Sequence, residues 1–249
     1  MNVKKVVRKF VNKFGYDIRQ IAHGPSKTRT TMAESYSLLH GMGFRPKIVV
    51  DVGVAKGTIE LYTVFPDAFF VLIEPLKEFE PDLKSILKKY KGLYVLAAAG
   101  ATSGQVIFNV HNNHLEGSSL YKETMGIEAD GCEITIPLIR IDDFLKESEL
   151  NAPELIKIDV QGAELEALEG AQKTLLEAEV VVLEVSLFEF MKGAPQLFDV
   201  VFYMKNHGFV AYDIIHGWNR PLDNALGQID VVFVKENGRF RQDHAYSKS

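Results

Sequence analysis

The sequence lacks several features that would place it in other classes of protein. It has a single cysteine, Cys132, so no disulfide can form within the chain and no zinc site built from several cysteines is available. Such cysteine usage is typical of a reducing compartment, and we expect a cytoplasmic protein. No apolar run approaches the roughly 18 residues of a membrane span, and the N-terminus alternates charged and apolar residues instead of carrying the apolar centre of a signal peptide. We therefore expect no transmembrane segment and no export.

Charge is distributed unevenly along the chain. The formal net charge is -5, yet residues 1–30 carry eight Lys or Arg and a single acid, Asp17. Apolar residues recur at helical spacing from Val3 to Phe14, which predicts a basic amphipathic helix. Such a helix either packs on the main domain or makes a peripheral contact with an anionic membrane or an acidic partner. The remaining chain is acidic and has no basic patch interleaved with aromatic residues, so nucleic-acid binding is not expected.

Short β-branched segments alternate with amphipathic segments over most of the chain. This alternation predicts an α/β fold with a mostly parallel sheet and helices on both faces. The expected strands are residues 47–53, 69–75, 93–99, 155–160, 180–185, 209–215 and 229–235, and the expected helices are 58–65, 81–90, 163–177 and 195–206. The expected organisation is a basic extension over residues 1–30, one catalytic domain over 31–235 and a flexible tail over 236–249. The oligomeric state is left open.

Residues 100–140 interrupt the alternation. Two strand-like pieces surround the polar loop HNNHLEGSSLYKE, which predicts a hairpin inserted over the carboxyl ends of the parallel strands. Ligands bind at these ends in open α/β sheets, so the loop is a candidate lid or substrate wall. His111 and His114 have no acid at ligand spacing, which favours a turn over a metal site. Ser118 and Ser119 are either ligand contacts or ordinary loop residues.

The segment VVDVGVAKG, residues 49–57, is a candidate binding loop. A Walker loop needs Lys-Ser/Thr after its last glycine, whereas Lys56 precedes Gly57 here, and the Gly-x-Gly-x-x-Gly of a dinucleotide fingerprint is also missing. A strand that ends at Glu74 follows about twenty residues later. Asp51 suits a cationic group, Glu74 suits the two hydroxyls of a ribose, and no phosphate is needed. S-adenosylmethionine therefore fits these groups better than a dinucleotide does.

The order of several motifs resembles the FkbM family of class I S-adenosylmethionine-dependent methyltransferases. The matching segments are DVGVAKGT, FVLIEP, AAAGATSGQVIFNV, GSSLYKE, LIKIDVQGAELEALEGA, VVLEVSLFEF, HGFVAYDI and QIDVVFV. The resemblance implies a Rossmann-like fold with a seven-stranded, mostly parallel sheet, an antiparallel last strand over residues 230–234, and methyl transfer to an oxygen nucleophile. The chain departs from the common family pattern at Val54 and Ala55 of the glycine loop, and at Gln161, where glutamate is common.

The same resemblance implies a set of residues around S-adenosylmethionine. Asp51, Gly53 and Gly57 would line its methionine side and Glu74 would hold its ribose, with S-adenosylhomocysteine as the product. The full set implied for the cofactor is Asp51, Gly53, Val54, Lys56, Gly57, Thr58, Glu74, Pro75, Ala98 and Ala99, the two alanines lying near the adenine. The implied acceptor is a small molecule or glycan, with a hydroxyl on a carbohydrate or on a glycosylated or polyketide-like metabolite.

Three residues are candidates for the general base. A neutral hydroxyl is a poor nucleophile, so a carboxylate or imidazole within hydrogen-bond reach should take its proton. Asp159 at the end of one expected strand is the first candidate, with Glu184 at the end of the next strand and His216 after the following one as alternatives. Asp159 and Glu184 also suit a divalent metal such as Mg²⁺, but no third ligand is apparent and a carboxylate without metal is favoured.

Other residues have plainer interpretations. Glu166 and Glu169 open an expected helix and are predicted to form its solvated face. Trp218 is either a platform on which a sugar stacks or a packing residue. Two other functions stay open from the residues alone. A nicotinamide or nucleotide-sugar oxidoreductase should carry the three-glycine turn, and a catalytically silent binding module should have lost Asp51, Glu74 and Asp159.

Overall fold

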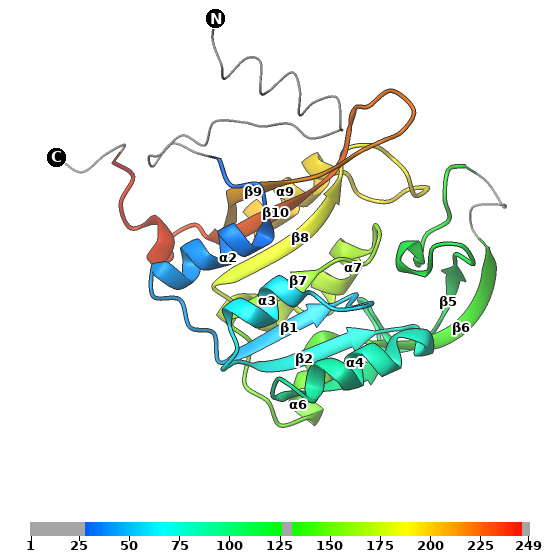
Figure 1. Ribbon diagram of the computed structural model, residues 1–249, viewed down its shortest axis with the longest axis horizontal. Helices are drawn as coiled ribbons and strands as arrows, with labels where there is room; N and C mark the ends of the chain where they lie inside the picture. The colour runs from blue at the N-terminus through cyan, green and yellow to red at the C-terminus, as the bar shows by residue number, and fades with distance from the viewer. Residues whose placement is uncertain (1–27, 126–130, 246–249) are drawn as a thin grey trace, which may run out of the picture.

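Seven strands form one central sheet in the computed structural model, which describes residues 28–125 and 131–245 (Figure 1). The strands lie in the order β3-β2-β1-β7-β8-β10-β9. Their bounds are β1 Ile48–Val52, β2 Phe69–Glu74, β3 Gly92–Leu96, β7 Leu155–Ile158, β8 Val180–Ser186, β9 Phe209–Asn219 and β10 Leu226–Lys235. Neighbours pair in parallel from β3 to β8, whereas β10 runs antiparallel to both β8 and β9. The predicted mostly parallel sheet with an antiparallel last strand is confirmed.

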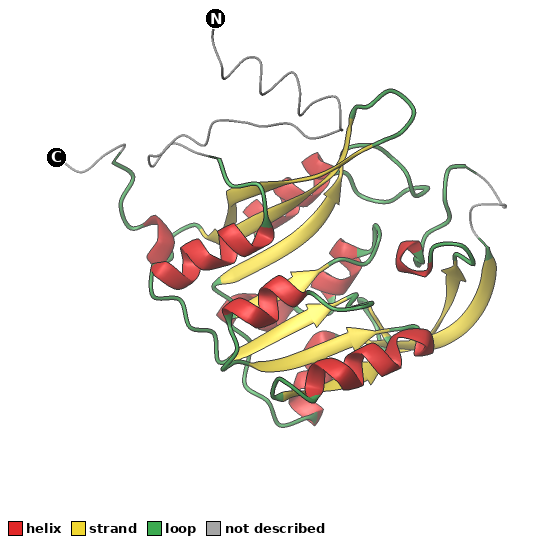
Figure 2. Cartoon of the chain, in the orientation of Figure 1, coloured by secondary structure: helices red, strands yellow, loops and turns green. Residues whose placement is uncertain are grey.

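Helices cover both faces of this sheet, as expected (Figure 2). Buried side chains of α2, α3 and α4 form one core with one face, and those of α6, α7, α8 and α9 form a second core with the other. The helices are α2 Met32–Gly41, α3 Ile59–Val64, α4 Glu80–Leu87, α6 Ile141–Glu147, α7 Glu164–Glu169, α8 Gln172–Glu177 and α9 Leu197–Asn206. Strand residues alternate between the cores, with Val49 in one and Val50 in the other. The central strands are therefore apolar on both faces.

The insertion predicted over residues 100–140 is a hairpin that belongs to a second, three-stranded sheet. Its strands are β4 Ala98–Ala99, β5 Gly104–Val110 and β6 Cys132–Ile139. The expected strand 93–99 is accordingly divided, because the chain leaves the central sheet after Leu96 and Ala98 pairs with Leu138 of β6. Phe108 and Ile136 pack this small sheet onto Leu76, just after β2. The hairpin thus stands beside the carboxyl ends of the central strands (Figure 1).

The helix expected over residues 163–177 is two helices in the structure. The break falls at Gly170, where a Cβ atom would lie 2.1 Å from the carbonyl oxygen of Gly100. The carbonyl of Gly170 also accepts a hydrogen bond from the backbone N–H of Asp142, at 2.9 Å. The backbone of Gly170 therefore serves a contact with another segment instead of a continuous helix. Helices α2 and α6 were not anticipated from the sequence.

Part of the expected C-terminal tail packs on the domain. The expected basic helix near the N-terminus lies outside the described residues. In the expected flexible tail, Arg239–Arg241 form the 3-10 helix η3, and Phe240 is buried with its ring centroid 5.6 Å from that of Phe44. Part of this tail is therefore packed on the domain. None of the helices in residues 28–125 and 131–245 is long and apolar enough to cross a membrane.

Candidate active site

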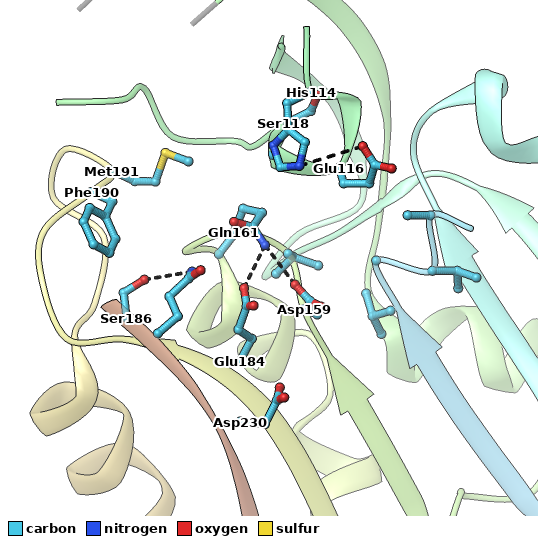
Figure 3. A pocket seen from close by; sticks show the side chains of 18 of the residues that line it. His114, Glu116, Ser118, Asp159, Gln161, Glu184, Ser186, Phe190, Met191 and Asp230 are labelled. Atoms are coloured by element: carbon cyan, nitrogen blue, oxygen red, sulfur yellow. Dashed lines mark hydrogen bonds and ion pairs between the residues drawn. The ribbon is translucent and has the colours of Figure 1, made fainter. Parts of the chain in front are cut away.

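The carboxyl ends of the central strands open onto a cavity of about 1480 Å³. Small-ligand pockets usually have about 300 to 1,000 Å³, so the cavity has room for two ligands. Three groups of residues line it: the glycine loop after β1, acids at the ends of β7 and β8 and within β10, and aromatic side chains from the loop after β8 and from β9. Figure 3 shows the acids Asp159, Glu184 and Asp230 together with Phe190. Residues that are far apart in the sequence therefore meet in one place.

The glycine loop depends on two residues with left-handed backbone. Gly53 has φ +73°, and a Cβ atom there would lie 1.7 Å from the backbone oxygen of Asp159. Gly57 has φ +109°, and its N–H donates to the carbonyl of Val54 at 2.7 Å. Side chains other than glycine rarely adopt such φ values. The glycines therefore let the loop lie directly against the end of β7.

Glu74 ends β2 on the wall of the cavity, where the sequence predicted it. Its Oε2 accepts a hydrogen bond from the backbone N–H of Ala55 at 2.8 Å, and its Oε1 accepts one from Leu76 at 2.9 Å. Burial raises the pKa of Glu74 to about 7, and the two backbone hydrogen bonds oppose that rise. Because each carboxylate oxygen accepts more than one hydrogen bond, the fixed carboxylate can still accept two from a ligand.

Asp51 lies beneath the loop and is not among the residues that line the cavity. Its carboxylate accepts a hydrogen bond from the Tyr62 hydroxyl of α3, and its Oδ1 lies 3.7 Å from the Lys157 ammonium. Burial raises the pKa of Asp51, while Lys157 and Tyr62 lower it. The contact expected between Asp51 and a ligand therefore does not follow from this geometry, in which Asp51 supports the loop through its neighbours.

The other residues expected around a cofactor surround the same end of the cavity. Lys56 crosses to the hairpin segment and pairs with Glu116 of the 3-10 helix η2 Leu115–Gly117. Thr58 directly precedes α3 and lines the cavity. The further lining residues of this end are Val54, Pro75, Leu76, Phe79, Ala98, Ala99 and Phe108. Apart from Glu74, Lys56, Thr58 and the loop backbone, this end is thus apolar.

Asp159 and Glu184 face one another across Gln161 (Figure 3). The side-chain amide of Gln161 donates to Asp159 Oδ1 at 3.0 Å and to Glu184 Oε2 at 2.8 Å. The second oxygen of Asp159 lies 3.2 Å from the Lys157 ammonium. Asp230 of β10 is the residue paired with Glu184 in the antiparallel register. Two of the three predicted base candidates therefore lie together, on adjacent parallel strands.

The charges of this group are unequal. Burial raises the pKa of Glu184 well above its ordinary value, and the nearby carboxylates of Asp159 and Asp230 raise it further. Burial and Asp159 raise the pKa of Asp230 to about 6. Burial lowers the pKa of Lys157, but Asp159 and Asp51 outweigh this effect and raise it. Glu184 therefore holds its proton to a higher pH than an exposed glutamate does, while the Lys157 ammonium lies against Asp159.

The third base candidate, His216, lies within a strand, and the possible metal site has no third ligand among the described residues. His216 pairs through its backbone with Ile229, inside β9 and not in the expected loop, and its side chain lies outside the described residues. Within the described part of the chain, no group of three or more His, Cys, Asp or Glu is arranged to hold a metal ion. Glu164 accepts backbone hydrogen bonds from Val160 and Gly162, and burial raises its pKa to about 7.

Aromatic side chains form the far rim of the cavity. The ring of Trp218 stacks on Phe190 with centroids 5.4 Å apart, and the Arg220 guanidinium lies 3.8 Å from the ring centroid of Phe188. Trp218 remains 43% exposed, and its indole N–H donates to Gln228. The packing interpretation of Trp218 is confirmed by its contact with Phe190, and the sugar platform stays a prediction at a residue that lines the cavity.

The hairpin segment is tied to the site by side chains. The Ser119 hydroxyl donates to the carbonyl of Gln161 at 2.7 Å, and the Tyr121 hydroxyl donates to Glu166. The prediction of a solvated Glu166 is wrong, since this carboxylate anchors the insertion, whereas Glu169 is exposed. Ser118 accepts a hydrogen bond from the backbone N–H of His111. The serines therefore hold the loop, and the segment forms one wall of the cavity.

Sequence reasoning missed two charged residues of the site, Lys157 and Asp230. Both interrupt otherwise apolar strands, LIKI and IDVVFV, and Lys157 is nine-tenths buried. A charge inside a buried strand needs a partner, and this requirement was the available signal. The direction of each side chain, toward Asp51 and Glu184 respectively, depends on the pairing of strands that are far apart in the sequence.

Comparisons with known proteins identify the family of this chain. Residues 51–211 match the model of the methyltransferase FkbM domain. The 2-O-methyltransferase NoeI of Sinorhizobium fredii (strain NBRC 101917 / NGR234) is 24% identical over 199 residues, covering 71% of this chain and 78% of that protein. The solved structure of methyltransferase FkbM from Methylobacillus flagellatus KT is 20% identical with a TM-score of 0.48. That match covers 74% of this chain but 43% of the Methylobacillus chain, less than half its length.

A second solved structure is similar over most of this chain. Magnesium protoporphyrin IX methyltransferase from Synechocystis PCC 6803, with bound S-adenosylmethionine, is 11% identical with a TM-score of 0.48, and covers 94% of this chain and 98% of its own. The family match includes the glycine loop, Glu74, Asp159 and Glu184. It describes a methyltransferase domain and gives no support to the oxidoreductase alternative. With well over half of its residues matched, this chain belongs to the FkbM family of methyltransferases.

Proposed function

We propose that this protein transfers a methyl group from S-adenosylmethionine to a hydroxyl oxygen of a carbohydrate or of a glycosylated or polyketide-like metabolite. The observation that carries the proposal is the position of the Asp159 carboxylate, which lies in the same cavity as Glu74 and is held by both Lys157 and Gln161. One end of the cavity suits a nucleoside, and the other presents a base.

The residues at the Glu74 end fit S-adenosylmethionine by their chemistry. Glu74 offers two acceptor oxygens to the hydroxyls of a ribose, and the apolar side chains of Leu76, Phe79 and Phe108 suit an adenine. The backbone at Gly53 and Gly57 would lie along the methionine part. The loop offers no Lys-Ser/Thr for a phosphate, and S-adenosylmethionine has none. When bound, S-adenosylmethionine supplies a methyl group on a sulfonium sulfur, which departs as the neutral thioether once the acceptor oxygen takes the methyl group.

The chain's own part in the reaction is to align the acceptor and to remove its proton. Asp159 accepts the proton from the acceptor hydroxyl as the new oxygen–carbon bond forms, and Lys157 balances the charge of Asp159 until then. The hairpin segment and the Phe190 loop pair over the cavity, with Thr124 N–H donating to the Phe190 carbonyl at 2.9 Å. Exclusion of water strengthens these electrostatic effects, and alignment alone supplies much of the acceleration of an in-line displacement.

A carbohydrate acceptor is supported by the rim of the cavity. Sugars present apolar C–H faces and polar edges, and the rim offers the partly exposed indole of Trp218 beside the polar side chains of Gln228 and Ser186. Gln228 donates to the Ser186 hydroxyl at 3.1 Å, so these groups are already oriented. The relative from Sinorhizobium fredii is a 2-O-methyltransferase by name, which also favours an oxygen acceptor.

Calorimetric titration with S-adenosylhomocysteine tests the donor half of the proposal. We expect micromolar binding, which Glu74→Gln weakens by at least about tenfold because one hydrogen bond to a charged group is worth about 1.5 to 3 kcal/mol. Glu78→Gln is the matched control, since Glu78 is exposed and does not line the cavity. Absence of binding by the folded wild-type protein, or preferential binding of NAD, would overturn the proposal.

The single tryptophan gives a direct test of the acceptor half. Trp218 is the sole indole of the chain and lies on the cavity rim, so binding of an acceptor should change its fluorescence. A panel of glycosides and glycosylated metabolites is titrated in the presence of S-adenosylhomocysteine, and the ligands that respond are then assayed for methylation. Asp159→Asn should lower turnover by about 100- to 10,000-fold with S-adenosylhomocysteine affinity retained. Asp67→Asn, at an exposed position, is the control. Unchanged turnover in Asp159→Asn would remove Asp159 as the base.

A further inference from the structure

We propose that Gln161 is a positioning residue whose side-chain amide takes the place of a shared proton between residues 159 and 184, so that the acid pair is assembled before any ligand arrives. A role of Gln161 in catalysis rests on the proposed function. Its effect on the neighbouring acids is a property of the folded protein and can be tested without an acceptor.

The geometry around Gln161 is that of a bridge. A primary amide nitrogen has two N–H donors, and the Gln161 nitrogen lies 3.0 Å from Asp159 Oδ1 and 2.8 Å from Glu184 Oε2 (Figure 3). Both donors are therefore used between two acids. Two buried carboxyl groups that share one hydrogen-bonding partner resist ionising together because their like charges repel, and a proton or a hydrogen-bond donor between them relieves this repulsion.

The backbone of Gln161 is held in an unusual conformation. Its φ is +54°, in the left-handed region that side chains other than glycine seldom occupy, and Gly162 follows with φ +100°. Such a conformation is strained and persists when surrounding contacts fix it. One such contact comes from the insertion, since the Ser119 hydroxyl donates to the Gln161 carbonyl at 2.7 Å. The wall of the cavity and the acid pair are thereby joined through a single residue.

Most of the charged groups around the Gln161 side-chain amide are acids. Every strand and helix that packs here brings a titratable group, and the excess is acidic. These groups are Lys157 and Asp159 from the β7 segment, Glu184 from β8, Asp230 from β10, Glu164 from α7, with Asp51 and Glu60 behind them. Lys157 is the cation that approaches Asp159 and Asp51. A third carboxylate in place of the Gln161 amide would therefore need a proton to fit.

The test is the pH dependence of thermal unfolding in Gln161→Glu. The added carboxyl should have a raised pKa in the folded protein, so the variant should be destabilised at pH 8 and regain stability as the pH falls to 5. We expect its loss in Tm relative to wild type to be larger at pH 8 than at pH 5 by at least about 4 °C. Gln105→Glu, at an exposed position of β5, should show no such difference. An equal loss of Tm at both pH values in Gln161→Glu would overturn the inference.

A kinetic measurement separates positioning from mere support of the fold. Gln161→Met keeps the size and lacks both donors, so it should reduce kcat with little change in S-adenosylhomocysteine affinity, whereas Gln161→Glu should also displace the pH profile of kcat. If the protein binds no S-adenosylhomocysteine, the proposed function fails while the unfolding experiment still decides the role of the amide. A pH profile of Gln161→Glu that coincides with that of wild type would contradict the positioning role.

Discussion

Gly53 determines how closely the ends of β1 and β7 approach one another. A hydrogen is the largest group that fits, because a Cβ atom would lie 1.7 Å from the Asp159 oxygen and 2.8 Å from its carbonyl carbon. The base candidate Asp159 follows β7 directly, so the spacing of these two strand ends also sets the distance from the loop to the base. The position of a glycine thus controls the relation of the proposed donor and acceptor ends.

Gly53→Ala should be destabilising for both steric and conformational reasons. The new methyl group meets backbone, which cannot move aside as a flexible side chain does, and alanine at φ +73° is strained. We expect a loss of at least about 1 to 3 kcal/mol in the free energy of unfolding, measured by urea denaturation. Gly41→Ala is the matched control, since nothing lies within 4 Å of that position at the end of α2. Equal stability of the two variants would contradict the steric argument.

The side chains that the sequence identified well are those at strand ends. Glu74 and Asp159 follow apolar runs, and the carboxyl ends of parallel strands share one edge, so their meeting could be predicted. Asp51 belongs to the same motif, yet its side chain points into the protein toward Tyr62. This direction depends on the alternation within β1 and on where α3 packs. A motif therefore predicts a neighbourhood, and the tertiary packing decides which members face the ligand.

Among the elements, the hairpin insertion is the wall that reaches over the proposed cofactor end. Lys56 in the glycine loop and Glu116 in η2 form an ion pair between two segments that are sixty residues apart. The side chain of Lys56 is 72% exposed and that of Glu116 is 34% exposed. The ion pair should therefore contribute little to the stability of the fold. It is placed to hold the loop against the insertion, and its effect should appear in the release of ligand.

Lys56→Met should accelerate dissociation of S-adenosylhomocysteine severalfold and leave Tm unchanged. Loss of the ammonium frees η2 from the glycine loop, while the methionine keeps most of the aliphatic stem. Stopped-flow displacement of a fluorescent analogue of S-adenosylhomocysteine provides the rate. Lys88→Met, at an exposed position on the far side of α4, serves as the control. Identical dissociation rates in the two variants would show that the ion pair does not retain the ligand.

The order of elements was predictable, whereas their ends were not. Apolar runs predicted the seven central strands, because strand periodicity is local, whereas the antiparallel direction of the last strand was implied by the family resemblance. The break at Gly170 arises from contact with Gly100, which is distant in the sequence, and no local signal distinguishes that glycine from a tolerated helical one. The extension of β9 through His216 to Asn219 likewise requires its partner β10. The sequence pattern did not predict the helix and strand ends that depend on a tertiary contact.

At the scale of the whole molecule, buried acids make stability depend on pH. Burial raises the pKa of Glu74 and Glu164 to about 7 and that of Asp230 to about 6, and it also raises the pKa of Glu184. Each folded-state pKa exceeds its unfolded value near 4, so the folded protein binds more protons than the unfolded chain between these values. Stability is therefore fully present at low pH within this window and is lost as the pH rises through 6 to 7.

The Tm should accordingly fall by roughly 5 to 10 °C between pH 5.5 and pH 8. Differential scanning calorimetry across this range checks the expectation. Glu164→Gln keeps the acceptor oxygen for Val160 and Gly162 but cannot ionise, so its Tm should fall less over the same range. Tyr94 and Lys84 lower the pKa of Glu80, and Lys56 lowers that of Glu116, so these two acids titrate below this window and should not alter the slope. A Tm that rises with pH would contradict the buried-acid argument.

The last strand of the chain lies inside the sheet and not at its edge. β10 separates β8 from β9, and among the described strands it is the hydrogen-bonded neighbour through which β9 joins the sheet. It also carries Asp230 to its place opposite Glu184. During synthesis, β8 and β9 therefore lack the strand that lies between them until β10 has been made. Neither the sheet nor the group of acids is complete until residue 235 has left the ribosome.

This order makes synthesis of the full chain a condition for a working site. A fragment ending at residue 225 should lack cooperative unfolding and bind no S-adenosylhomocysteine, and adding a synthetic peptide of residues 226–249 should restore both. Native-like unfolding of the fragment alone would contradict this view. Because of this topology, a prematurely terminated chain should stay unfolded and sensitive to proteolysis, and should not bind or transfer a methyl group.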